Sequence, residues 1–118
     1  MRYVRAVSPA HKPLVFLSGA IIKTPPLTAA ARGEVGYLLR QLQAGESLAL
    51  PRSRPMPSIG ARCHELRVRD ETVTWRSVYR IDPKAIVVVE VFTKKTQTTP
   101  RVVIDTCQKR LRAFDEGA

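Results

Sequence analysis

The sequence predicts an α+β fold in which an antiparallel β-meander is combined with helices on either side of it in the chain. Two observations support this prediction. Between residues 62 and 82, apolar and polar side chains alternate in runs that a short turn interrupts, as in consecutive antiparallel strands. Residues 27–42 and 104–114 instead carry apolar side chains three or four positions apart, which is the spacing of amphipathic helices.

The chain begins with a segment of little periodicity and then reaches a short apolar run. Residues 1–12 are expected to be an extension and residues 13–118 a single domain, because a chain of 118 residues suits one core. The run Leu14-Val15-Phe16-Leu17 is expected to form a short strand that ends at Ser18-Gly19.

Next comes a predicted helix that starts near Pro25-Pro26 and stops at Gly45. Glycine costs a helix about 1 kcal/mol relative to alanine. Because Gly33 and Gly36 interrupt the segment, it is expected to form either two helices or one bent helix. Its apolar stripe consists of Leu27, Ala31, Val35, Leu38 and Leu42.

Residues 46–61 are the least regular stretch of the chain. Their three prolines exclude a helix interior or a central strand. Arg52 and Arg54 make the stretch basic. A loop of this length is either functional, ordered by a partner, or a solvated linker, and the sequence leaves these alternatives open.

Three strands joined by short turns are expected at residues 62–68, 72–82 and 85–92. The third is apolar enough to be buried on most of both faces. Alternation sorts the side chains of the first two strands onto two faces of the sheet. One face is expected to pack against a helix through Leu66, Val68, Trp75 and Ile81. The other face is expected to stay open and to carry Glu65, Arg67, Arg76 and Arg80.

The loop after the third strand places two lysines where a buried strand ends. Lys94 and Lys95 are flanked by threonines, Thr96 among them, whose hydroxyls can donate to phosphate oxygens. A loop on a rigid strand is a common place for binding chemistry, and the same residues also fit a solvated loop. Thr99-Pro100 then predicts the start of the C-terminal helix, with a hydroxyl cap before a proline.

Composition narrows the classes of protein that fit. The net charge of +10, from 20 basic and 10 acidic residues, favours polyanions or an acidic partner. Cys63 and Cys107 make neither a disulfide framework nor a zinc signature, and no carboxylate cluster suits a hard metal, so no metal or other cofactor is expected. Because no membrane-length apolar stretch and no signal peptide are present, a cytoplasmic location is expected.

The chemistry that remains is phosphate chemistry without a metal. Cations on the open face can hold a phosphodiester and stabilise charge that develops on its oxygens. One carboxylate on the same face can move a proton. If the nucleic acid is RNA, its own 2′-hydroxyl is the nucleophile and the protein need not supply one.

Several short motifs together resemble one toxin family. They are Cys63-His64-Glu65-Leu66-Arg67, Trp75-Arg76-Ser77-Val78-Tyr79-Arg80, and Phe92-Thr93-Lys94-Lys95-Thr96 with Thr99-Pro100. Over about residues 12–116 the chain is similar to the phage-derived HigB-like branch of the RelE/ParE toxin superfamily. The resemblance implies a RelE-like fold, an antiparallel β-meander with a short N-terminal strand, two N-terminal helices or one bent helix, and a C-terminal helix.

The resemblance also implies a function. Such a protein is the toxin of a type II toxin–antitoxin pair, an endoribonuclease (mRNA interferase) that cuts messenger RNA on the ribosome and inhibits translation. Its partners are the ribosome, messenger RNA and a cognate antitoxin, in this branch a HigA-like helix-turn-helix protein. The residues expected to be catalytic are Arg76, Lys94, Lys95 and Glu65. Those expected to contact nucleic acid are Arg67, Arg80, Thr96, Arg52 and Arg54.

Two questions stay open at this point. Glu65 is either the proton acceptor, as glutamate is in some relatives, or a salt-bridge partner of Arg67 or Arg76. The chain is either a nuclease, a same-fold toxin without nuclease activity such as the gyrase-directed ParE members, or a non-catalytic phage-related module that binds nucleic acid or protein. The charge of Arg76, Lys94 and Lys95 favours the nuclease over the gyrase inhibitor.

Overall fold

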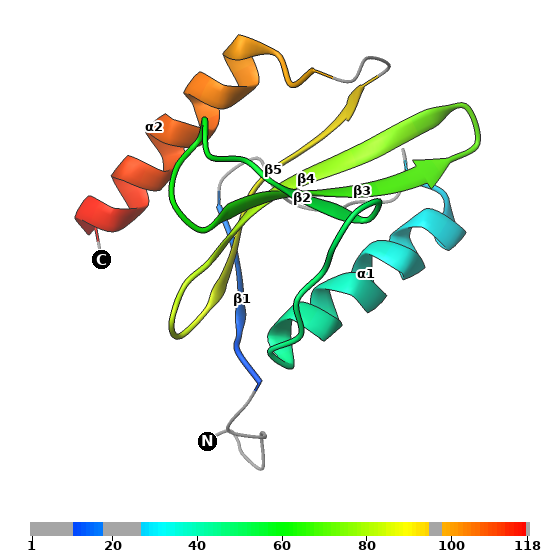
Figure 1. The fold of residues 1–118 in the computed structure, drawn as a ribbon, viewed down its shortest axis with the longest axis horizontal. Coiled ribbons are helices and arrows are strands. Elements are labelled where there is room, and N and C mark those ends of the chain that lie inside the picture. Colours follow the sequence, from blue (N-terminus) through cyan, green and yellow to red (C-terminus); the bar gives the residue numbers. More distant parts are fainter. Residues whose placement is uncertain (1–10, 18–26, 95–97, 118) are drawn as a thin grey trace.

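A five-stranded mixed sheet separates two helices that lie on its opposite faces (Figure 1). The computed structural model describes residues 11–17, 27–94 and 98–117, with the backbone alone at Lys94. The elements are β1 (Leu14–Phe16), α1 (Ala29–Gln43), β2 (Ser53–Pro55), β3 (Cys63–Asp70), β4 (Val73–Ile81), β5 (Ile86–Lys94) and α2 (Arg101–Gly117). The predicted α+β class is therefore confirmed.

The predicted meander forms the middle of the sheet, whose strand order is β1-β5-β4-β3-β2. β3, β4 and β5 pair antiparallel in sequence order. The short N-terminal strand is also confirmed, and it joins β5 in parallel, with Leu14 opposite Ile86. Lys12 fixes the approach to this strand, because its N–H donates to the carbonyl of Gln43 (2.8 Å) and its Nζ donates to the carbonyl of Asp82 (2.9 Å).

Strand β2 lies within residues 46–61, which were expected to contain no strand, so that prediction is wrong for Ser53–Pro55. These residues pair antiparallel with β3, and Pro55 lies opposite His64. Proline is tolerated here because β2 is the edge of the sheet and has a partner on one side only. The prolines exclude a central strand but are compatible with an edge strand.

In the described residues the N-terminal half contains one helix, α1, which runs for 15 residues without a break. Thr28 is its N-cap, and the Thr28 hydroxyl accepts a hydrogen bond from the N–H of Ala31 (3.1 Å). The predicted start at Pro25-Pro26 lies outside the described residues. Neither α1 nor α2 combines the length and the apolar character that a membrane-spanning helix needs.

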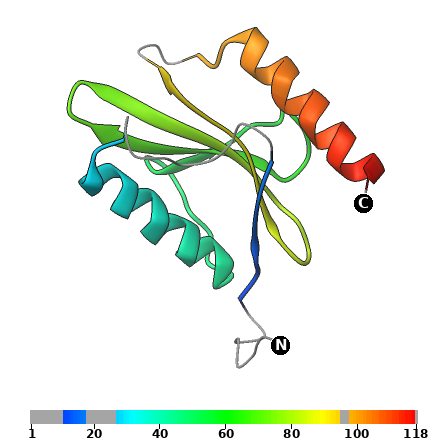
Figure 2. The same cartoon turned by 180° about the vertical axis from the view of Figure 1, so that it is seen from behind.

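Each helix buries one face of the sheet, as the view from behind also shows (Figure 2). On the α1 side, Leu66, Val68 and Trp75 belong to the core as predicted, and Ile81 packs at its margin. The opposite face is not open as expected, because α2 covers part of it. The residues that α2 buries there are Ile104, Cys107 and Leu111, and they pack with Cys63, Val78, Val87 and Val89 of the sheet.

The C-terminal helix starts close to its predicted position. The N–H of Ile104 donates to the carbonyl of Pro100 (3.2 Å), so the helical hydrogen bonds begin at that proline. The hydroxyl of Thr99, which was expected to cap the helix, donates to the carboxylate of Glu65 instead (2.8 Å). Thr99 therefore connects the start of α2 to the middle of β3.

Candidate functional site

A buried carboxylate forms the centre of the candidate site. The side chain of Glu65 on β3 is 0% exposed. Its Oε1 accepts hydrogen bonds from Arg76 Nη1 (2.7 Å) and Arg54 Nε (3.1 Å), and its Oε2 accepts one from Thr99 Oγ1 (2.8 Å). A buried charge is costly unless it is paired and hydrogen-bonded. These four residues, called the Glu65 cluster below, therefore stabilise one another as a unit.

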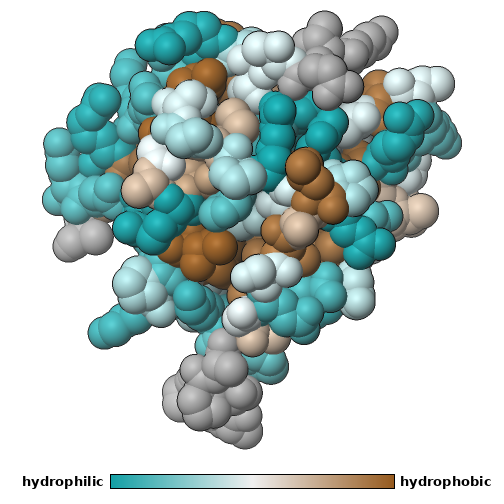
Figure 3. All heavy atoms as spheres, viewed as in Figure 1, coloured by the Kyte–Doolittle hydropathy of each residue, from teal (hydrophilic) through white to brown (hydrophobic). Residues whose placement is uncertain are grey.

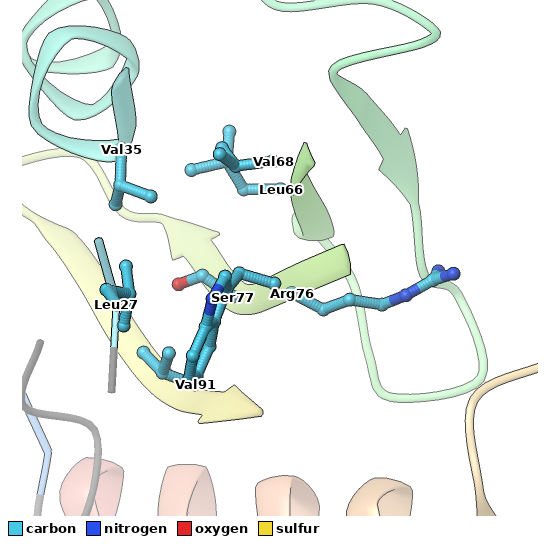
Figure 4. Close-up of a pocket in the computed structure, with 8 residues that line it drawn as sticks. Leu27, Val35, Leu66, Val68, Arg76, Ser77 and Val91 are labelled. Carbon is cyan, nitrogen blue, oxygen red and sulfur yellow. The ribbon is translucent and has the colours of Figure 1, made fainter. Parts of the chain in front are cut away.

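The register of the sheet brings the cluster together. Arg54 lies directly opposite Glu65 in the pair of β2 and β3. On β4, Val78 lies opposite Glu65, so Arg76 is a diagonal neighbour on the same face. Figure 4 shows Arg76 extending away from the side of the sheet on which Leu66 lies, while the next residue of β4, Ser77, points toward that side.

The cluster reaches solvent through one of its members. The side chain of Arg76 is 3% exposed, whereas that of Arg54 is 29% exposed. Nη2 of Arg54 also lies 3.4 Å from Thr99 Oγ1, which closes the ring of hydrogen bonds around Glu65. Two guanidinium groups and a hydroxyl are donors that suit any oxyanion, a phosphate as well as a carboxylate. An anionic ligand would meet the cluster on the side of Arg54.

Two further predicted arginines adjoin the cluster. Arg67 lies directly opposite Arg76 on the neighbouring strand. Partial burial lowers the pKa of Arg67, and the nearby charges of Arg76 and Arg54 lower it further. The N–H of Arg67 donates to the carbonyl of Arg52 (2.8 Å), so the backbones of Arg52 and Arg67 run side by side. Positive charge therefore continues from the cluster across three neighbouring segments.

Arg80, in contrast, takes part in a separate ion-pair group. Its Nε donates to Asp82 (2.6 Å), and its Nη2 donates to Asp82 (2.9 Å) and to Asp115 (2.7 Å). Its guanidinium carbon also lies 6.0 Å from the centre of the Phe114 ring. These contacts attach the end of α2 to β4. The structure thus gives Arg80 a role in packing, and its predicted contact with nucleic acid stays a prediction.

The predicted lysine pair is described only in part. The backbone of Lys94 ends β5 opposite Thr74, two positions along β4 from Arg76. Lys95 and Thr96 lie outside the described residues. Their predicted roles therefore stay predictions, and the backbone of Lys94 places the strand end beside the arginine-rich part of the sheet.

Sequence reasoning missed the place of Thr99 in the cluster and assigned Arg54 to nucleic acid without its carboxylate partner. The sequence did contain one indication of these contacts. Glu65 is a lone acid among bases on a face that a helix can cover, and a buried carboxylate needs hydrogen-bond donors around it.

No group of three or more histidine, cysteine or acidic side chains that could hold a metal ion occurs among the described residues. The Glu65 cluster contains one carboxylate, two guanidinium groups and one hydroxyl.

The two cysteines do not add a nucleophile to the site. Both thiols are buried and free. Burial raises the pKa of Cys107 to about 12, and burial also raises the pKa of Cys63. A thiol that stays protonated at neutral pH is a poor nucleophile. Cys107 is a small core residue on the buried face of α2.

The chain matches a known protein family. The sequence matches the family described as phage derived protein Gp49-like (DUF891) over residues 26–112. This range contains all four members of the Glu65 cluster, and it ends before Asp115, which holds Arg80. No curated protein matches the chain.

Proposed function

We propose that this chain, which belongs to the phage-derived Gp49-like family, is the HigB-like toxin of a type II toxin–antitoxin pair and a ribosome-dependent endoribonuclease. The observation that carries the nuclease proposal is the Glu65 cluster, in which one carboxylate accepts hydrogen bonds from Arg76, Arg54 and Thr99 at 2.7, 3.1 and 2.8 Å. The five-stranded sheet with two helices is compatible with a RelE-like toxin fold.

In the proposed reaction the 2′-oxygen of the RNA attacks the adjacent phosphorus. Glu65 takes the proton of the 2′-hydroxyl, and the bond from phosphorus to the 5′-oxygen of the next nucleotide breaks. The departing oxygen takes a proton from water, which leaves a 2′,3′-cyclic phosphate and a 5′-hydroxyl end. Arg76 and Arg54 stabilise the negative charge that develops on the phosphate oxygens, and Lys94 and Lys95 add further positive charge.

Substrate binding and activation of the base are coupled in this scheme. The donors that would hold the phosphate are the same guanidinium groups that now hold Glu65. When the phosphodiester takes these donors, the carboxylate oxygens of Glu65 lose their present partners and become available to accept the proton of the 2′-hydroxyl. The acid and the arginines then act in sequence rather than as a fixed ion pair.

A cell-based experiment tests the proposal. Induction of the protein alone should arrest bacterial growth, and mapped messenger RNA should show cuts that depend on translation. Cleavage by the purified protein with ribosomes should persist when EDTA chelates free metal at a concentration that leaves ribosomes intact. Growth at the normal rate with soluble protein present would contradict the toxin assignment. Cuts that vanish with EDTA would contradict the metal-free mechanism.

A second candidate, a non-catalytic module that binds nucleic acid or protein, is favoured by one observation. Glu65 and Arg76 are 0% and 3% exposed, as in an ion pair that only stabilises a fold. The same experiment separates the candidates. Growth arrest with intact messages would favour the binding module, and double-strand DNA breaks with intact messages would favour a gyrase-directed toxin.

A further inference from the structure

A second basic feature borders the Glu65 cluster. A groove of about 310 Å³ lies beside the edge of β3, beyond the point where β2 ends. It is lined by Glu34, Pro51, Arg52, Arg67, Arg69 and Thr74, and is called the arginine groove below. Arg69 was not among the residues that the sequence pointed to. On the face shown in Figure 3, hydrophilic residues surround smaller hydrophobic patches.

The arginines of the groove form a row that continues from the cluster. Arg67 and Arg69 lie on the same face of β3, about 6.6 Å apart along the strand at a rise of about 3.3 Å per residue. Arg67 lies opposite Arg76 of the cluster, and Arg69 lies opposite Thr74. Thr74 in turn lies opposite the backbone of Lys94. The row therefore runs from the cluster toward the end of β5.

The groove arginines lack the acidic partners that other arginines of the sheet have. Carboxylates lie within 3.1 Å of the side chains of Arg54, Arg76 and Arg80. In the described parts of the chain, no ion pair or side-chain hydrogen bond involves Arg52, Arg67 or Arg69. Glu34 lines the groove but is not within ion-pairing distance of them. Three neighbouring positive charges with so little compensation repel one another, and an anionic ligand would remove that repulsion.

We infer that the arginine groove binds the sugar–phosphate backbone of single-stranded RNA beside the scissile phosphate. The inference rests on the proposed function, because the Glu65 cluster sets the position of the scissile bond. The strand then runs from the cluster along β3, past Arg67 and Arg69, toward the turn between β3 and β4. Arg52 holds the outer side of the path. The end of the sheet near Arg80 is not part of it, because the Arg80 donors are taken by carboxylates.

The chemistry of the groove favours RNA over a protein partner. Guanidinium forks match pairs of phosphate oxygens, and phosphates repeat along a strand as the arginines do along β3. Protein interfaces also use arginine, but there it accompanies tryptophan and tyrosine anchors that fill well-packed pockets. Among the described residues that line the groove, Pro51 is the one apolar residue. A ligand that carries regularly spaced negative charge fits this lining.

A binding experiment on the intact protein tests the inference. The probe is a fluorescein-labelled decauridylate with 2′-O-methyl groups. It keeps the phosphates that the groove would bind, and the methyl groups block the 2′-oxygen as a nucleophile and so prevent cleavage. Its Kd is measured by fluorescence anisotropy over a range of KCl concentrations. Each phosphate contact contributes about 0.7 to the slope of log Kd against log salt for a single strand. Removing one contact should therefore weaken binding about fivefold at ~0.1 M salt.

The variants are Arg52→Gln, Arg67→Gln and Arg69→Gln, and the control is Lys84→Gln. Lys84 is exposed in the turn between β4 and β5, at the other end of β4, and its substitution removes the same charge. Each arginine variant should lose affinity and slope, and the lysine variant should bind like the unchanged protein. The emission of Trp75 and the melting temperature check that each variant is folded.

The outcomes separate this inference from the proposed function. Arginine variants that bind like Lys84→Gln, or an unchanged protein that does not bind the oligonucleotide at low salt, would overturn the groove assignment even if messages are cut in cells. Loss of binding in the arginine variants without any message cleavage would keep the groove and refute the nuclease. If decaglutamate competes for the protein as well as the oligonucleotide does, the groove recognises charge alone and the inference fails.

Discussion

The carboxylate of Glu65 and the guanidinium of Arg76 lie 2.7 Å apart with almost no contact with water. At the scale of single residues, this burial decides what a substitution can test. Removing one partner of such a pair leaves an uncompensated buried charge and costs about 3–5 kcal/mol. Removing both charges avoids that penalty. A single substitution at Arg76 therefore mixes an effect on folding with any effect on catalysis.

The first prediction uses this difference. Arg76→Gln should lower the free energy of unfolding by about 3–5 kcal/mol, whereas Glu65→Gln combined with Arg76→Gln should lower it much less. Urea denaturation followed by circular dichroism measures both. The double variant should be folded and not toxic if the proposed function is correct, while Lys109→Ala on the exposed surface of α2 should stay toxic. A double variant less stable than either single variant would contradict the ion-pair account.

Single residues of the site could be predicted only in strands where polar and apolar side chains alternate. Alternation along the strands placed Glu65, Arg67 and Arg76 on one face, and the structure has them there. Alternation does not tell how deeply a face is buried, because that depends on a helix remote in sequence. Arg54 and Thr99 come from segments without a period, so their convergence on Glu65 depends on tertiary packing that no local pattern contains.

At the scale of elements, one carboxylate joins the end of β3 to α1 and β4. Oδ2 of Asp70 accepts hydrogen bonds from the N–H of Thr28 (3.1 Å) and from Nε1 of Trp75 (3.1 Å). Its Oδ1 accepts one from the hydroxyl of Thr28 (2.8 Å), which also caps α1. The backbone N–H of Thr28 is the main cause that lowers the pKa of Asp70 below its ordinary value.

The second prediction follows from the sign of this shift. Because the pKa of Asp70 is lower in the folded protein, its contribution is present above the ordinary value of 3.8 and is lost as the pH falls below it. Unfolding free energy should therefore decrease in that acidic range, and less steeply in Asp70→Asn. The emission of Trp75, the single tryptophan, reports the change. Asp105→Asn, on the exposed surface of α2, is the control and should keep the original slope.

A small cavity on the α1 side of β4 gives the third prediction. The hydroxyl of Ser77 is buried, and no hydrogen-bond partner for it occurs among the described residues. The cavity has a volume of about 10 Å³, and apart from Ser77 and Arg76 the residues that line it are apolar or aromatic. Figure 4 shows Ser77 among Leu27, Val35 and Val91. Ser77→Val removes an unsatisfied buried hydroxyl and adds apolar contact.

The substitution Ser77→Val should raise the free energy of unfolding by about 1 kcal/mol, because the desolvation penalty of the hydroxyl disappears. Thermal denaturation measures the change. Ser58→Ala, at an exposed serine, should leave stability within about 0.5 kcal/mol. A less stable Ser77→Val would contradict the account of an unsatisfied hydroxyl beside space for a larger side chain.

Helices and strands whose apolar side chains repeat at a regular spacing were predicted well. The pairing of the strands with one another was predicted less well. The three meander strands, the apolar stripe of α1 and the last helix follow from side-chain spacing alone. β2 was missed because prolines argue against strands in general, although not at an edge. The parallel addition of β1 to β5 also left no local trace, because it depends on two segments that are far apart in sequence.

At the scale of the whole molecule, the sheet has a larger and a smaller core on its two faces. α1 buries Ala31, Val35, Leu38, Leu39 and Leu42. α2 buries Ile104, Cys107 and Leu111, and its end is held by the pair of Arg80 and Asp115. Since fewer apolar side chains hold α2, local opening should separate α2 from the sheet at a lower free energy than α1.

The fourth prediction tests this difference by native-state hydrogen exchange. Backbone amides in the middle of α2 should exchange faster than those in the middle of α1. Asp115→Asn should accelerate exchange in α2 further, with a cost of about 0.2–1 kcal/mol, because Asp115 is largely exposed. Exchange in α1 should not change. Equal protection of the two helices in the unchanged protein would show that the sheet and both helices open only together.

The parallel pairing of β1 with β5 has a consequence for the order in which the protein is completed during its synthesis. Lys12, just before β1, contacts Asp82, which is 70 positions later in the chain. Glu65 accepts a hydrogen bond from the hydroxyl of Thr99, which is 34 positions later. A chain that emerges N-terminus first therefore exposes β1 before its sheet partner exists and carries Glu65 before its last donor arrives. Under the proposed function, a nascent toxin is inert until Thr99 has left the ribosome that makes it.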